Sequence, residues 1–216
     1  TGTQMISAAT CTATATSICP RVVFANGAFF IFWYGAATLE CRVVLATAPT
    51  TLGAMVALIA SASFIQRNFD ACTFDSTSVA VAYVWNDGVT SVRTLSVIHV
   101  AGVPSVSLGP TNLLTVGQLA TADVVGIACT PYSSALYGVF VSGFGATSHA
   151  GVAGVTLDNT LAVVSGPTQL FATAPAVNTS CHITAVRVGA NFNIYTDNQS
   201  SWNTAALAPL WFVTCS

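Results

Sequence analysis

The residues of this chain that could carry acid–base chemistry are few and scattered. Its 216 residues include seven acidic residues, five basic residues and three histidines, and every basic residue is an arginine. Asp70 and Asp75 are close in sequence but fall in a stretch that we interpret as a turn-rich linker. Asp87 and Asp158 stand in expected turns, where an aspartate bonds its own backbone. A catalytic carboxylate pair needs convergence in space that this spacing does not predict.

The histidines and the absence of known catalytic motifs also argue against a catalytic site. His99, His149 and His182 lie far apart. His99 falls in an expected strand, where a lone histidine is typical of packing rather than ligation. The chain has no nucleophile elbow, P-loop, zinc-protease motif or dinucleotide fingerprint. We therefore expect no catalytic residue, no cofactor-binding residue and no metal ligand, and we interpret the chain as a non-enzyme.

The tryptophans are the remaining candidate site residues. Aromatic faces can stack on sugars or fill a contact between subunits, so we single out four possible ligand or interface aromatics: Trp33, Trp85, Trp202 and Trp211. The alternative is that these rings are core packing on strands. The sequence leaves both interpretations open.

The seven cysteines form no C-x-x-C pair, which excludes a zinc ribbon and a thioredoxin-type redox motif. Their number is odd and their spacing is wide. We interpret most of them as small buried hydrophobic residues. Cys11 and Cys19 are the nearest candidates for a local bridge.

The elements that must position these residues are predicted to be strands. Valine, threonine, alanine, glycine and aromatic residues dominate the chain, and these types favour strands and turns. Asn26-Gly27 separates apolar runs at 21–24 and 29–34, and Asn86-Asp87-Gly88 separates another pair. Such dipeptides accept the positive φ of a tight antiparallel hairpin. Further turns are expected at Gly109-Pro110 and Gly166-Pro167.

One plan of strand, turn and aromatic-rich strand occurs four times. The four stretches begin at Arg21, Asp75, Val124 and Ile183, so the repeat is about 50 residues long. That length suits a blade of a β-propeller, and four repeats predict a propeller or part of one. The alternative is a β-sandwich or jelly roll. We expect an N-terminal arm or linker at 1–19 and a single all-β domain at 20–216.

The first two repeats also carry a resemblance. Their runs Val-Val-Phe-Ala-Asn-Gly, Phe-Ile-Phe-Trp-Tyr and Ala-Tyr-Val-Trp-Asn-Asp-Gly resemble degenerate propeller repeats of structural and tail proteins of tailed bacteriophages, including the tail nozzle of short-tailed phages. The resemblance covers residues 20–110. It implies a propeller-type fold in a virion component, and no functional residue is carried over from it.

Composition limits the partners. Only 6% of residues are charged while 53% are hydrophobic, which excludes intrinsic disorder. A net charge of −2 excludes nucleic-acid binding through the phosphates. Proline and glycine interrupt the uncharged runs, so no membrane span is expected. A surface so poor in charge suggests that other protein covers much of it.

These observations lead to a first hypothesis and two alternatives. The first is a non-enzymatic structural subunit or domain of a virion, a tailed-phage tail or capsid-associated protein, located in the virion and acting through assembly. Its partners would be further copies of itself and other structural subunits. One alternative is a secreted or surface lectin-like carbohydrate-binding module, which would be extracellular. The other is a viral jelly-roll coat protein.

Overall fold

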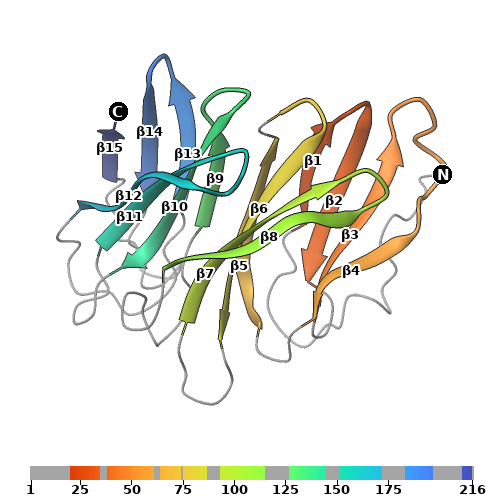
Figure 1. The fold of residues 1–216 in the computed structure, drawn as a ribbon, viewed down its shortest axis with the longest axis horizontal. Coiled ribbons are helices and arrows are strands. Elements are labelled where there is room, and N and C mark those ends of the chain that lie inside the picture. Colours follow the sequence, from red (N-terminus) through yellow and green to blue (C-terminus); the bar gives the residue numbers. More distant parts are fainter. Residues whose placement is uncertain are drawn as a thin grey trace, which may run out of the picture.

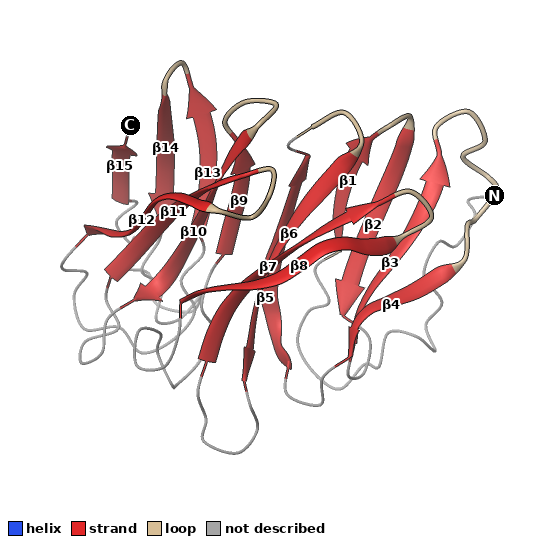
Figure 2. Cartoon of the chain, viewed as in Figure 1, coloured by secondary structure: helices blue, strands red, loops and turns tan. Residues whose placement is uncertain are grey.

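The fold is all-β, as the sequence predicts (Figures 1 and 2). The computed structural model describes residues 20–34, 38–60, 64–73, 75–86, 93–114, 127–144, 151–171, 183–196 and 211–215. The arm or linker expected at 1–19 lies outside these residues. All fifteen described elements are strands.

The strands form four antiparallel sheets. The first sheet holds β1 (Arg21–Ala25), β2 (Ala28–Tyr34), β3 (Thr38–Leu45) and β4 (Met55–Ala60). The second holds β5 (Phe64–Thr73), β6 (Ser78–Asn86), β7 (Arg93–Ala101) and β8 (Ser105–Leu114). The third holds β9 (Ile127–Pro131), β10 (Leu136–Phe144), β11 (Gly151–Asp158) and β12 (Val163–Phe171). The fourth holds β13 (Ile183–Val188), β14 (Asn191–Thr196) and β15 (Trp211–Cys215).

Each predicted repeat falls in one sheet, and the strands of a sheet are neighbours in chain order. The second repeat was predicted to begin at Asp75 and so omitted β5, the first strand of its sheet. The hairpin predicted at Asn26-Gly27 is confirmed, because these residues have φ values of 49° and 69° and connect β1 to β2. The second predicted hairpin pairs β6 with β7 from Ser78 opposite Ala101 to Asn86 opposite Arg93. The Asp87-Gly88 part of its turn lies outside the described residues.

The four sheets stand face to face in a row, in the order of the sequence (Figure 1). The first strands of successive sheets contact one another, β1 with β5, β5 with β9 and β9 with β13. β1 and β13 lie far apart in this row, so the described sheets radiate from a line of first strands without closing into a ring (Figure 1). The four described sheets contain no crossover connection, whereas a jelly roll needs one.

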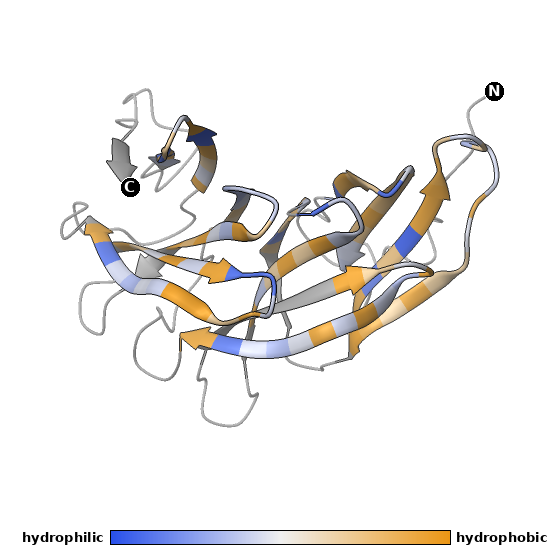
Figure 3. Ribbon diagram, turned by 45° about the horizontal axis from the view of Figure 1, so that its top comes forward, coloured by the Kyte–Doolittle hydropathy of each residue, from blue (hydrophilic) through white to orange (hydrophobic). Residues whose placement is uncertain are grey.

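A strand in the middle of this row is buried on both faces. Along β6, Val81 and Tyr83 pack toward the first sheet, whereas Ala80 and Ala82 pack toward the third. Successive strand residues point to opposite faces, so an uninterrupted apolar run is what a sheet buried on both sides requires. The outermost strands β8 and β12 instead mix hydrophilic and hydrophobic residues and are mostly exposed (Figure 3).

The turns predicted at the two Gly-Pro pairs are wrong. Gly109-Pro110 lies within β8, and Gly166-Pro167 lies within β12. Both are edge strands, where a proline without an N–H does not break a ladder. The pairing of each strand with its neighbour is irregular. The two glycines have φ values of 95° and 96°, which a side chain rarely allows.

Candidate functional site

Two of the aspartates behave as the sequence predicts, as turn formers. Asp75 Oδ1 accepts the backbone N–H groups of Thr77 at 2.7 Å and Ser78 at 2.6 Å. Asp158 Oδ1 accepts the backbone N–H of Thr160 at 2.8 Å. These carboxylates organise the β5–β6 and β11–β12 connections and point at no common centre.

Asp70 corrects the linker prediction, because it lies on β5 and is mostly buried. Its Oδ2 accepts the backbone N–H of Cys129 at 2.8 Å, and its Oδ1 accepts the Nε–H of Arg21 at 2.8 Å. Since Arg21 lies on β1 and Cys129 on β9, one carboxylate joins the first strands of three sheets. The strand was missed because its sequence mixes polar and apolar residues without regular alternation.

The electrostatics of Asp70 are set mainly by burial. Loss of solvent raises the pKa of its carboxyl group, while the Cys129 N–H and the Arg21 guanidinium act in the opposite direction. Arg21 keeps 46% of its side-chain exposure, against 18% for Asp70, so water screens the ion pair on its arginine side. Both carboxylate oxygens are engaged in contacts within the chain. This arrangement suits a structural tie better than a general base.

Three cysteines are buried as thiols, as predicted for small hydrophobic residues: Cys41, Cys72 and Cys129. Burial raises the pKa of Cys41 to about 12 and raises that of Cys129 well above its usual value. A thiol nucleophile must ionise, so burial disfavours a nucleophilic role for these two cysteines in the folded chain. Within the described ranges, no three His, Cys, Asp or Glu side chains gather where they could hold a metal ion.

An apolar cavity of about 410 Å³ opens at the turn end of the first sheet. Ala28, Phe30 and Val43 form one wall, and the β7–β8 turn at Val103 and Pro104 forms the other. Its lining also includes Asn26 and Thr51, and contains no charged residue. Such a cavity can accept an apolar group but offers nothing that would move a proton.

The outer face of the first sheet, the face turned away from the second sheet, exposes four large hydrophobic side chains. They are Val22 at 59%, Phe24 at 52%, Phe29 at 37% and Met55 at 41% exposure. The strand register places Phe24 beside Phe29, with ring centroids 5.2 Å apart. We call these four residues the exposed apolar face.

Only Trp33 among the four candidate tryptophans has a described side chain, and it is fully buried. It packs with Ile31, Val44 and Leu52 on the same side of the first sheet as the exposed apolar face. Its ring offers no open surface for a sugar to stack on. Trp85 lies in β6 and Trp211 in β15, but their side chains, and the whole of Trp202, lie outside the description.

None of the three histidines has a described side chain. His99 lies in β7, as predicted, opposite Ala80, and its side chain is outside the description. His149 and His182 fall outside the described residues. The important residues that sequence analysis missed are Asp70 and its contact Cys129, which are 59 positions apart. The sequence offers one local signal: Asp70 and Cys72 stand two residues apart, so on a strand they face the same side. Nothing in the sequence links either of them to Cys129.

In the described residues, the fold is a stack of antiparallel meanders, three of four strands and one of three, with an apolar end face. No family model matches the sequence, and no curated protein matches it. Among solved structures, the chain shows a slight likeness to oligopeptidase B from Leishmania major, with a TM-score of 0.18 and 10% identity. The match covers 88% of this chain and 33% of that protein. No described helix is long and apolar enough to cross a membrane.

Proposed function

We propose that this chain is a non-enzymatic structural subunit or domain of a virion, a tailed-phage tail or capsid-associated protein, that works by assembly. The observation that carries the assembly role is the exposed apolar face at one end of the row of sheets. The virion setting is supported by the resemblance of the first two repeats to tail-protein repeats. The partners would be further copies of this chain and other structural subunits.

The packing inside the chain supports this proposal. The second and third sheets are each packed on both faces, and the residues between the sheets are almost all apolar. The inner face of the first sheet is apolar, whereas its outer face combines apolar side chains with Glu40 and Arg42 and leaves Val22 and Phe24 more than half exposed. Contiguous apolar surface on a folded protein marks an interaction site. A further protein surface would give this sheet the double-sided burial of its neighbours.

The low charge of the chain fits the same role. Interfaces between subunits are depleted in lysine, glutamate and aspartate, and permanent interfaces resemble a protein core. The chain has no lysine and a single glutamate, Glu40. A free monomer with this surface would be poorly soluble, whereas a subunit covered by its neighbours would not.

Sedimentation of the full chain and one variant tests the proposal. We expect the natural chain to sediment as an assembly at micromolar concentration. Phe24→Ser with Val22→Thr removes two apolar groups from the exposed apolar face, and this variant should shift toward monomer by at least tenfold in dissociation constant.

A matched control uses the equally exposed Val163 and Val164 on β12, at 47% and 57% exposure. Val163→Thr with Val164→Thr should leave the assembly unchanged, because it lies at the outer edge of the third sheet. A natural chain that is monomeric at micromolar concentration would overturn the proposal. An equal shift in both variants would overturn the choice of face.

A further inference from the structure

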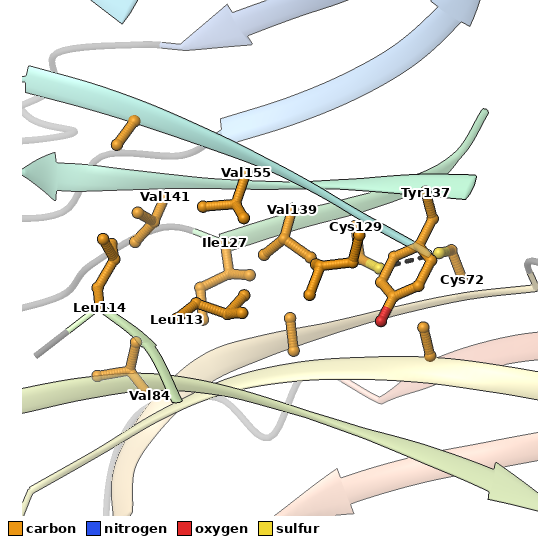
Figure 4. Close-up of a cluster of buried hydrophobic side chains, with 14 of the residues drawn as sticks. Cys72, Val84, Leu113, Leu114, Ile127, Cys129, Tyr137, Val139, Val141 and Val155 are labelled. Carbon is orange, nitrogen blue, oxygen red and sulfur yellow. Dashed lines mark hydrogen bonds between the residues drawn. The ribbon is translucent and has the colours of Figure 1, made fainter. Parts of the chain in front are cut away.

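Two cysteines that are distant in sequence meet between the second and third sheets. Cys72 on β5 and Cys129 on β9 bring their Sγ atoms to 2.9 Å, and the two side chains are only 6% and 7% exposed (Figure 4). A disulfide bond is about 2.05 Å long, so less than about 1 Å of approach separates this pair from a covalent bond.

The pair is held in place from a second direction. Asp70 Oδ2 accepts the backbone N–H of Cys129 at 2.8 Å, and Asp70 stands two residues before Cys72 on the same strand. The backbone and the sulfur of Cys129 are therefore both bound to β5. Tyr137 and Val139 lie beside the sulfurs and shield them (Figure 4).

We propose that Cys72 and Cys129 are a site of disulfide formation that links the second sheet to the third when the chain folds in the presence of a small-molecule disulfide such as oxidised glutathione. One protein thiolate attacks the glutathione disulfide, giving a mixed disulfide and one glutathione thiolate. The second protein thiolate attacks the protein sulfur of the mixed disulfide and releases the other glutathione. Two protein thiols are oxidised, one disulfide is reduced, and the two protons pass to the glutathione thiolates.

The same burial that brings the sulfurs together decides when they react. In the folded chain burial raises the pKa of the Cys129 thiol, and an exposure of only 7% limits the approach of an oxidant. The reaction belongs to folding, before β9 closes over β5. The native reduced protein should therefore oxidise at this pair at least tenfold more slowly than the refolding protein.

The cross-link would close a loop between positions 57 residues apart. For a loop of this length in a domain of this size, we expect the melting temperature to rise by about 10 °C. Cys41 is equally buried but lies between the first and second sheets, so it takes no part in this cross-link or in the rise in melting temperature.

The test is refolding of the denatured, reduced full chain with oxidised and reduced glutathione, and in parallel with reductant alone. Free thiols are then alkylated in denaturant at low pH, and disulfide-linked peptides are identified by mass spectrometry. We expect a linked peptide pair containing Cys72 and Cys129, and the rise in melting temperature only in the oxidised sample. Cys129→Ala should lose that rise, whereas Cys41→Ala should keep it.

Recovery of both Cys72 and Cys129 as alkylated thiols from the sample refolded with oxidised glutathione would overturn the proposal. So would a linked peptide that joins either of them to another cysteine. If Cys129→Ala does not fold, the peptide map of the natural chain decides the matter alone.

Discussion

The junction between the first and second sheets and the junction between the second and third sheets solve one packing problem in two ways. The first, which we call the aromatic junction, is filled largely by the rings of Phe30, Phe32, Tyr34, Phe69 and Tyr83. Tyr34 and Phe69 meet edge to face at 5.0 Å between centroids. The second, which we call the aliphatic junction, is filled by alanine, valine, leucine, isoleucine and two thiols around a single tyrosine, Tyr137.

The difference begins in the central strand. β6 sends Tyr83 and two valines toward the first sheet but two alanines and one valine toward the third. Small residues on one face leave space that the neighbouring sheet fills with Tyr137 and Leu157. The aromatic junction is therefore stabilised mainly by the packing of large side chains. Directed contacts cross both junctions. Asp70 pairs with Arg21 across the first, and the Asp70–Cys129 hydrogen bond and the sulfur pair cross the second.

The largest expected effect comes from removing bulk at the aromatic junction. Phe32 is fully buried, so Phe32→Ala should lower the free energy of unfolding by about 3–5 kcal/mol. Val139→Ala, at an equally buried position of the aliphatic junction, should cost about 2 kcal/mol. Urea denaturation measures both. Equal losses would contradict the claim that bulk holds the first junction.

Asp70→Asn tests the directed contacts and should have an intermediate effect. We expect a loss of about 1–3 kcal/mol, because the Arg21 pair and part of the Cys129 contact are weakened.

The pH dependence of that loss follows from burial. Because the pKa of Asp70 is raised in the folded chain, the folded state holds its proton more tightly than the unfolded state does. Its contribution is complete below the unfolded value near 3.9 and is lost as pH rises through the folded value. The loss caused by Asp70→Asn should therefore be largest near pH 3.5 and smaller at pH 7, by about 1.4 kcal/mol for each unit of pKa difference. A loss that grows with pH would mean that the arginine outweighs burial.

The smallest effect is expected at two hairpin glycines where an added side chain would meet no neighbouring atom. Gly27 in the first sheet and Gly189 in the fourth have φ values of 69° and 64°, and a Cβ at either would meet no atom within 4 Å. Gly27→Ala and Gly189→Ala should each cost about 1 kcal/mol from backbone strain alone. Thermal unfolding of the two variants measures the losses. A clear difference between them would show that the junctions influence the turns.

What could be predicted from the sequence was local. The period of about 50 residues and the Asn26-Gly27 turn were legible because each depends on neighbours in the chain. Turns were wrongly predicted at Pro110 and Pro167 because proline is a turn signal in the local sequence. Proline is acceptable within these strands because β8 and β12 lie at sheet edges, and that position depends on the whole fold. The contact of Asp70 with Cys129 could not be predicted, since it depends on how two sheets stack.

The two prolines within the edge strands have a consequence for the chain among its own copies. A chain built almost entirely of apolar strands is at risk of amyloid-like stacking, in which a foreign strand extends an open ladder. At β8 and β12 that ladder lacks an N–H at Pro110 and Pro167, and it is distorted around Gly109 and Gly166. These features disfavour growth by strand addition at the two edges. The proposed assembly would therefore use a sheet face, such as the exposed apolar face, in preference to these two edges.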